Sequence, residues 1–263
     1  MLNESPAQVR KDLKTIRSFD NEKACFDTII DILRDRSYGE SVELVTELIK
    51  DNKLKFILSL GFGGKFANYH LSLRRKTIPV YSLIPTQSEI DLDATIKYFN
   101  KEHVKNAFSS KCIIIRPIVT FNGTFIVDGH HRWSEIYALN RNANVECIDI
   151  TGNLSPLSML KAVQCTLGSN LGKLKVLSVE GKNVFKTTES YVEKHLQFIK
   201  DNKELFDELS LHYRDPIKEI ARNIMEMKTG NTPIINAPNR GEMPQTSKDP
   251  ELFKDLRKGI TKV

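Results

Sequence analysis

The sequence predicts an α+β protein in which a central mixed β-sheet domain is flanked by N- and C-terminal helical extensions. Apolar residues recur at helical spacing on both sides of the middle of the chain, and short β-favouring runs gather within it. An Asn-Gly pair also separates two of those runs. We expect four segments: an N-terminal helical extension at 1–77, the sheet domain at 78–153, a C-terminal helical region at 154–229, and a Pro- and Gly-rich tail with a short terminal helix at 230–263.

The N-terminal extension carries two helical patterns. Phe26, Ile29, Ile30 and Leu33 follow i, i+3, i+4, i+7 spacing, and a second apolar stripe follows a predicted break at Tyr38-Gly39. One apolar stripe for each helix is enough to pack it against a neighbour. These faces are therefore expected to form a core rather than to carry chemistry.

Two stretches before the sheet domain invite a phosphate-binding interpretation. Residues 61–65, Gly-Phe-Gly-Gly-Lys, combine glycines with a lysine but lack the spacing of a Walker motif, so a turn is predicted. Residues 74–76, Arg-Arg-Lys, are expected to form a solvated loop, and contact with a phosphate backbone is the alternative.

The sheet domain is predicted to begin with a strand at 80–84 that Pro85 ends, because proline fixes φ and lacks an N–H donor. A polar loop at 85–91 follows. An amphipathic helix then starts near Asp91 or Asp93, and either residue is a good N-cap.

A β-hairpin is predicted around Asn122-Gly123, because both residues accept the positive φ of a type I′ turn. Its arms are residues 113–121 and 124–127. Pro117 in the first arm favours an edge strand or a bulge. A further strand is expected at 144–150.

The C-terminal half favours helix again, with no internal repeat. The tail has too few apolar residues to form a core of its own. The predicted elements are helices at 191–199 and 217–227, a small hairpin of 174–179 with 183–185 that turns at Glu180-Gly181, and a last helix at 252–256.

The charge and the cysteine content limit the functions that the sequence favours. The chain has 39 Lys and Arg against 33 Asp and Glu, a net charge of +6, which favours polyanionic partners such as nucleotides or nucleic acid. No apolar run reaches the ~18 residues of a transmembrane helix, and the first residues do not resemble a signal peptide. We therefore expect a cytoplasmic protein without a membrane partner. Cys25, Cys112, Cys147 and Cys165 lie apart in apolar segments and are predicted to be reduced core thiols.

The stretch that carries the functional signal is residues 125–133, Phe-Ile-Val-Asp-Gly-His-His-Arg-Trp. Three β-favouring residues run into Asp128-Gly129, and a helical pattern starts immediately afterwards. A helix N-terminus has unpaired N–H groups and a partial positive charge, so it attracts anions. We interpret this turn as a phosphate site.

A strand, an Asp-Gly-His-His-Arg turn at 128–132 and a helix, after an extended segment with a Pro-containing polar loop, resemble the ParB/sulfiredoxin fold. ParB partition proteins hold nucleotide phosphates with a Gly-x-x-Arg turn, and the ADP-dependent free serine kinases carry Asp-Gly-His-His-Arg. Residues 111–150 also resemble ParB-like proteins of large bacteriophages, often described as nucleases, which would imply the host cytoplasm. The resemblance covers residues 78–150. Sulfiredoxin has a cysteine where His130 stands, so sulfinic acid repair is not expected.

The resemblance assigns roles within the turn. Gly129 would let the backbone approach the phosphates, and Arg132 would fork onto phosphate oxygens. His130 and His131 would present N–H groups, and one of them would donate to the transferred group or act as acid or base. Asp128 would hold Mg²⁺ together with nucleotide oxygens. The structural alternatives are an N-cap role for Asp128 and packing for one of the histidines, because adjacent helical residues point about 100° apart.

The loop at 85–91 is expected to lie across from the turn. Glu89 is the candidate general base, with a solvated loop acid as the alternative, and Thr86 and Gln87 are candidate nucleotide contacts. The first hypothesis is a phosphotransferase or nucleotide hydrolase that uses ATP, ADP or CTP with Mg²⁺ and acts on a small hydroxyl compound or a hydroxylated base in DNA.

Two other functions remain open at this level. One is a DNA-binding protein or nuclease, in which the same turn grips a backbone phosphate. The other is a nucleotide switch without catalysis. The helical flanks could cover the site, form a homodimer or dock a partner.

Overall fold

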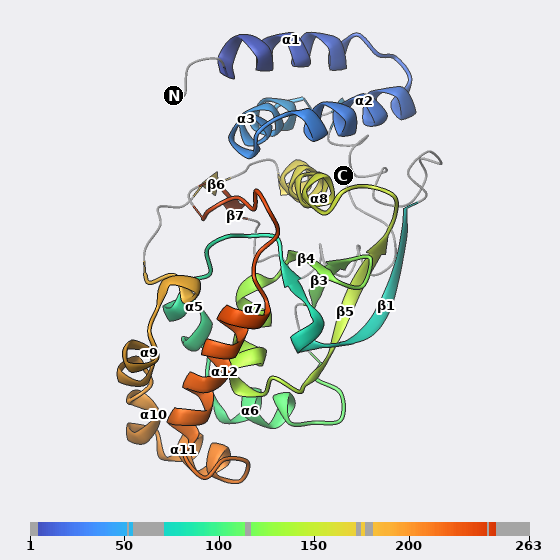
Figure 1. Cartoon of the computed structure of the whole chain (residues 1–263). Coiled ribbons are helices and arrows are strands. Elements are labelled where there is room, and N and C mark those ends of the chain that lie inside the picture. The colour runs from blue at the N-terminus through green and yellow to red at the C-terminus, as the bar shows by residue number, and fades with distance from the viewer. Residues whose placement is uncertain are drawn as a thin grey trace. The chain divides into compact units, whose positions relative to one another are not determined.

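The computed structural model confirms an α+β protein that combines helices with a five-stranded mixed sheet (Figure 1). It describes residues 5–51, 53–54, 71–113, 117–171, 175–176, 181–240 and 242–245. The predicted turn at 61–65 and the predicted helix at 252–256 lie outside these residues.

The chain forms two compact units. Unit 1 combines residues 1–74, 148–178 and 241–263, and unit 2 combines residues 75–147 and 179–240. Each unit combines separate stretches of the chain. The four predicted segments follow one another along the sequence, so they do not coincide with the two units.

Unit 1 is built from helices. They are α1 (Ser5–Arg17), α2 (Glu22–Asp35), α3 (Tyr38–Ile49) and α8 (Pro156–Leu171). The predicted stripe from Phe26 to Leu33 is buried, as expected for a packing face. The predicted break between the two helices is present, but it lies at residues 36–37 rather than at Tyr38-Gly39. Ser37 is the N-cap of α3 in a capping box with Glu40, so the helix begins at Tyr38.

Unit 1 also contains a short antiparallel pair of β6 (Lys175–Val176) with β7 (Pro244–Gln245). The predicted hairpin of 174–179 with 183–185 is therefore wrong for the residues the structure describes. Asn183 instead forms a bridge with Asp91, and η3 (Val184–Lys186) is a turn of 3₁₀ helix. The backbone of Lys182 and Val184 is hydrogen-bonded to Leu92 and Ile90, so these groups are not available to the predicted hairpin.

The sheet has the strand order β1-β5-β3-β4-β2. Its strands are β1 (Ser72–Pro79), β2 (Ile84–Pro85), β3 (Ile118–Phe121), β4 (Phe125–Asp128) and β5 (Asn144–Thr151). β2 runs parallel to β4, and β3 runs antiparallel to it. The sheet is therefore mixed, as predicted. The start of β1 and the end of β5 belong to unit 1.

The predicted hairpin is confirmed by positive φ values of 51° at Asn122 and 68° at Gly123. The edge position suggested by Pro117 is wrong, because β3 lies between β5 and β4 and Pro117 precedes it. The register shifts between Val119 and Thr120, so the irregularity lies two residues further along.

The predicted strand at 80–84 is mostly wrong. β1 ends at Pro79, η2 (Val80–Ser82) is a 3₁₀ turn, and only Ile84–Pro85 pairs as β2. The basic residues 74–76 lie in β1 rather than in a loop, and their exposure agrees with the solvated part of the prediction.

Seven helices of unit 2 fall within the described residues. They are α5 (Leu92–Ile96), α6 (Lys101–Ala107), α7 (His130–Leu139), α9 (Glu189–His195), α10 (Phe198–Asp201), α11 (Lys203–Ser210) and α12 (Pro216–Gly230). The helix predicted to start near Asp91 or Asp93 is present as α5. The predicted helices at 191–199 and 217–227 are also present, although the first of these is divided between α9 and α10. No separate helix was predicted for α6 or α11. Asp91 is the N-cap of α5, as expected.

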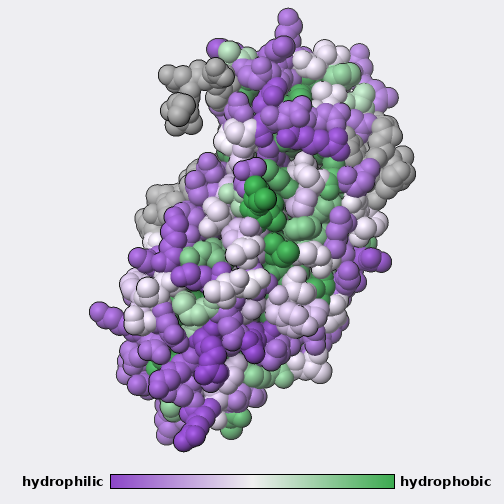
Figure 2. All heavy atoms as spheres, viewed as in Figure 1, coloured by the Kyte–Doolittle hydropathy of each residue, from purple (hydrophilic) through white to green (hydrophobic). Residues whose placement is uncertain are grey.

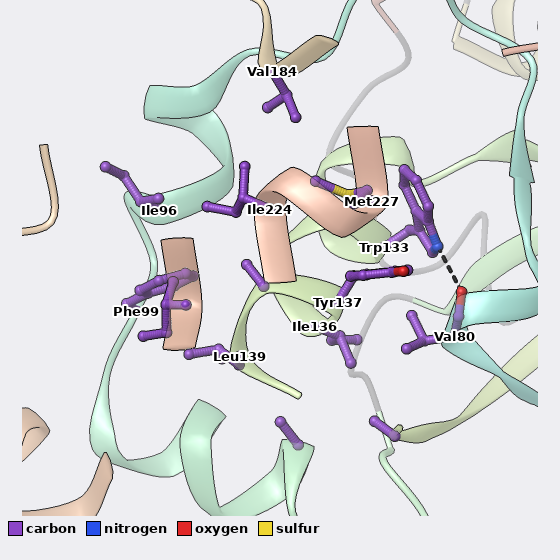
Figure 3. Packing of buried hydrophobic residues seen from close by; sticks show 14 of the residues in the cluster. Val80, Ile96, Phe99, Trp133, Ile136, Tyr137, Leu139, Val184, Ile224 and Met227 are labelled. Carbon is purple, nitrogen blue, oxygen red and sulfur yellow. Dashed lines mark hydrogen bonds between the residues drawn. The ribbon is translucent and has the colours of Figure 1, made fainter. Parts of the chain in front are cut away.

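Helix α7 lies at the centre of the unit 2 core, and α12 packs against it (Figure 3). Trp133 is fully buried, and its indole Nε1–H donates to Val80 O at 2.9 Å. Its ring meets Tyr137 edge to face at a centroid distance of 5.8 Å. This packing fixes the orientation of α7 and hence the direction in which its first turn points.

Outside the core, the surface is mainly hydrophilic over α9, α11 and α12 (Figure 2). In the described ranges, none of the helices is both long and apolar enough to span a membrane. Cys25, Cys112, Cys147 and Cys165 are buried free thiols, as predicted. Burial raises the pKa of Cys25 to about 11 and those of Cys112 and Cys165 to about 12, so these thiols stay protonated.

Candidate functional site

The turn between β4 and α7 has the predicted strand, glycine and helix order. Asp128 is the last residue of β4, Gly129 is the N-cap with φ 92°, and His130 opens α7. A Cβ atom at position 129 would lie 2.8 Å from an Nη atom of Arg132. Glycine is required here both for the left-handed backbone and for the space that Arg132 occupies.

Arg132 lies along this turn rather than pointing away from it. Its Nη2 donates to Asp128 Oδ2 at 2.8 Å and to Pro117 O at 3.3 Å, and 26% of the side chain is exposed. Asp128 therefore forms an i, i+4 ion pair and is not the N-cap of α7. The guanidinium is held in place and remains partly accessible.

Both histidines accept hydrogen bonds from the loop at 85–91. The N–H of Thr86 donates to His130 Nε2 at 3.2 Å, and the N–H of Asp91 donates to His131 Nε2 at 3.4 Å. Each accepting Nε2 carries no proton, so the proton of each neutral ring lies on Nδ1. These two hydrogen bonds attach the loop to the start of α7, one near the beginning of the loop and one at the end of the loop.

The electrostatics of the histidines agree with this arrangement. Burial lowers the pKa of His130 to about 3, with smaller contributions from the charges of His131 and Arg132. Burial also lowers the pKa of His131 to about 4, and the positive charge of Arg240 adds to that effect. Both rings are neutral at physiological pH. The sequence suggested that one of these histidines donates to the transferred group or acts as acid or base. The Nε2 atoms are not available for donation, because each accepts a backbone N–H.

In the loop at 85–91, the side chain of Glu89 is partly exposed, whereas Thr86 and Gln87 are buried. Thr86 is fully buried, and its hydroxyl donates to Ile126 O, while Gln87 is 5% exposed. A ligand would reach these two predicted contacts only after the loop moved. The side chain of Glu89 is 20% exposed, and its Oε1 lies 3.8 Å from Lys186 Nζ. Glu89 is therefore the accessible carboxylate at the middle of the loop.

Asp91 closes the loop and was predicted only as a helix cap. Its Oδ1 accepts from the N–H of Asp93, and its Oδ2 accepts from Arg240 Nη1 at 2.8 Å. Gly181, with φ 90°, lies so close that a Cβ atom there would overlap the Asp91 carboxylate. The backbone at Gly181 therefore leaves room for the carboxylate in this position.

Residues 231–240, which follow α12, lie along the loop and were not predicted to belong to the site. Asn231 Nδ2 donates to Tyr81 O and Leu83 O, and the N–H of Ile234 donates to Pro85 O. Further along, the N–H of Ser88 donates to Pro238 O at 2.8 Å. The segment therefore follows the loop from beginning to end.

Arg240 ends this segment beside the candidate base. Its backbone N–H donates to Glu89 Oε2 at 3.2 Å while its guanidinium holds Asp91, and only 13% of the side chain is exposed. Sequence reasoning missed Arg240 because its partners lie far away in the chain. Its position after a Pro-rich stretch is the one local signal, and that signal is weak.

The charges around the start of α7 are almost balanced. Arg132 and Arg240 face the carboxylates of Asp128, Asp91 and Glu89, with Lys186 nearby. Within the described residues, no group of three or more His, Cys, Asp or Glu side chains could hold a metal by itself. The predicted role of Asp128 would need phosphate oxygens to complete the ligand set, because Mg²⁺ is usually bound by one or two carboxylates together with substrate phosphates. One oxygen of Asp128, Oδ2, is paired with Arg132.

These features define the chain as an α+β protein whose mixed sheet leads through a glycine turn into an arginine-bearing helix start. No family model matches the chain, and no curated protein or solved structure was found to be similar to it. The resemblance to the ParB/sulfiredoxin fold therefore rests on the motif and its surroundings.

Proposed function

We propose that this chain is a nucleotide-binding protein of ParB/sulfiredoxin type that transfers or hydrolyses a phosphoryl group of ATP, ADP or CTP. The observation that carries the proposal is the turn at Gly129, where a left-handed glycine, a helix N-terminus and the partly exposed Arg132 occur together. A helix start of this kind attracts phosphate, and a guanidinium recognises its oxygens in a fork.

Phosphoryl transfer depends mainly on positioning and charge neutralisation, with a base for the acceptor hydroxyl. Glu89 is the candidate base, because the histidines fasten its loop to α7 and its carboxylate remains partly exposed. His130 and His131 serve as positioning residues in this scheme. Mg²⁺, bound with the nucleotide at Asp128, would supply neutralising charge to the phosphate oxygens.

The test combines binding with turnover. Addition of ATP, ADP or CTP with Mg²⁺ is expected to raise the melting temperature, because a ligand that binds only the folded state stabilises it. Release or transfer of labelled phosphate then separates an enzyme from a nucleotide switch. No shift with any of the three nucleotides contradicts the proposal.

The role of Glu89 has its own test. Glu89→Gln is expected to lower turnover by roughly 10²- to 10⁴-fold while nucleotide binding is retained, because the amide cannot accept the proton. Glu204→Gln changes an exposed residue of α11 and serves as the matched control, with turnover unchanged. Full turnover in Glu89→Gln would remove Glu89 from the mechanism.

A DNA-binding protein or nuclease is the second candidate. It is supported by the net charge of +6 and by the exposed basic residues 74–76 on β1, an edge strand of the sheet. However, the sequence of unit 2 contains 19 Lys and Arg against 17 Asp and Glu, so the motif does not lie in a strongly basic unit. Salt-sensitive retention of DNA without any nucleotide-induced shift would favour this candidate.

A further inference from the structure

The site has two arginines, and both are engaged by carboxylates. Arg132 is bound to Asp128 and Arg240 to Asp91, each at an N–O distance of 2.8 Å. The N–H of Asp91 also donates to His131 Nε2, so one residue links Arg240 to the first turn of α7. The second guanidinium therefore lies next to the turn that carries the first.

The pairing of Arg240 with Asp91 is partly buried but does not complete a packed core. The exposed fractions of the two side chains are 13% and 10%, so both partners lie close to the surface. Asp91 makes its second contact, as the N-cap of α5, through the other carboxylate oxygen. Release of Arg240 would leave that cap intact, so the arginine can change partners without undoing the helix.

We propose that Arg240 is a second phosphate-binding residue of the α7 site, and that a chain of two or more phosphates displaces Asp91 from its guanidinium. This inference rests on the proposed nucleotide function and names its ligand class as a polyphosphate. A single phosphate can be bound by the helix N-terminus and by Arg132, which is paired with Asp128 but has 26% of its side chain exposed. A polyphosphate extends further and carries enough charge to compete with a carboxylate for the second arginine.

The charge balance supports this exchange. With both arginines paired and both histidines neutral, the site at rest offers little net positive charge to an anion. An anion then binds tightly only if an arginine exchanges its carboxylate partner for that anion. The backbone N–H of Arg240, which donates to Glu89 Oε2, makes the same contact whichever side chain stands at position 240. Substitution of the side chain therefore separates phosphate binding from positioning of the candidate base.

The experiment is calorimetric titration of the full chain with ADP and with inorganic pyrophosphate, both in the presence of Mg²⁺. Arg240→Gln is expected to weaken binding of both by roughly 10- to 100-fold, the usual loss for a charge-assisted pair. Arg240→Lys keeps the positive charge but lacks the forked geometry of a guanidinium. Its affinity is expected to lie between those of the wild type and Arg240→Gln. Arg214→Gln removes the same charge from an exposed position of unit 2 and is the matched control, with affinity unchanged.

The decisive variant is expected to raise the affinity rather than lower it. Asp91→Asn keeps an acceptor for the N–H of Asp93 but no longer competes as an anion for Arg240. It is expected to bind pyrophosphate several-fold more tightly than the wild type. A purely structural ion pair predicts the reverse, because loss of either partner would then loosen the same loop.

The outcomes separate this inference from the proposed function. Wild-type binding with equal affinities in Arg240→Gln and Arg214→Gln overturns the role of Arg240 and leaves the nucleotide function standing. Weaker binding in Asp91→Asn also overturns the exchange. No binding of either probe by the wild type overturns both proposals. The melting transition followed by Trp133, the single tryptophan, verifies that each variant is folded.

Discussion

Lys161 in unit 1 and the two arginines beside α7 in unit 2 are held by different kinds of partner. In unit 1, Lys161 is 2% exposed, and its Nζ donates to the carbonyl oxygens of Leu33, at 2.7 Å, and of Arg36. These carbonyls belong to the C-terminal end of α2, where helical partners are lacking. Burial lowers the pKa of Lys161 to about 8. The lysine thus completes a helix end, and an anion in solution cannot replace those carbonyls.

Beside the start of α7 in unit 2, the two arginines have carboxylate partners near the surface, and His130 and His131 are neutral and accept hydrogen bonds. A carboxylate partner can be exchanged for a phosphate, whereas a helix carbonyl cannot. The comparison shows that burial of a charge alone does not mark a functional site. The nature of its partner distinguishes Lys161 from the arginines beside α7. A carboxylate partner is not peculiar to unit 2, because Arg36 of unit 1 is paired with Asp12 at 2.8 Å.

Acidification should have the largest effect, and it should act on unit 2. Between pH 6.5 and about pH 4 the unfolded chain protonates both histidines while the folded chain keeps them neutral, so stability is lost as the pH falls. Each pKa unit is worth about 1.4 kcal/mol, which gives roughly 3 kcal/mol for each histidine by pH 4. Urea unfolding at several pH values, followed by Trp133 fluorescence, measures this loss.

The matched variant for this prediction is His131→Gln, which keeps a side-chain acceptor but has no proton to gain. Its unfolding free energy should fall less steeply with acid, by up to about 1.4 kcal/mol per pH unit. If wild type and variant show the same slope, His131 does not stay neutral in the folded state.

Lys161→Met should come next in size and should act on unit 1. Methionine fills a similar volume but leaves the carbonyls of Leu33 and Arg36 buried without their donor, at a cost of about 2–4 kcal/mol. Hydrogen exchange of the α2 amides measures the loss, and Lys14→Met on the exposed face of α1 is the control. Nucleotide affinity should not change, and a large change in affinity would contradict the structural role assigned to Lys161.

Gly129→Ala should destabilise the protein less than the preceding changes, by about 1–2 kcal/mol, because an L side chain is strained at φ 92°. The new Cβ would also push Arg132 from its place, so nucleotide affinity should fall as well. Gly39→Ala in α3 is the matched change in unit 1. Space surrounds its Cβ position, and alanine there should stabilise the helix by about 0.5–1 kcal/mol. Equal effects of the two substitutions on nucleotide binding would contradict the assignment of the site.

The sequence by itself determined the features that depend on neighbouring residues. These are the apolar stripe from Phe26 to Leu33, the type I′ turn at Asn122-Gly123, a helix cap at Asp91 or Asp93, of which the structure uses Asp91, and the glycine turn before α7. Each is decided by backbone geometry or side-chain spacing within a few residues, so a local pattern is sufficient to predict it.

Tertiary structure alone decided what those elements contact. The histidines accept from the loop at 85–91, Arg240 reaches the same loop from the end of residues 231–240, and β6 pairs with β7 rather than with residues 183–185. These partners are far apart in the chain, and their selection depends on burial and on the satisfaction of every buried donor. Such long-range selection cannot be read from a local pattern. The sequence therefore predicted the glycine turn before α7 but not the position of Arg240 beside it.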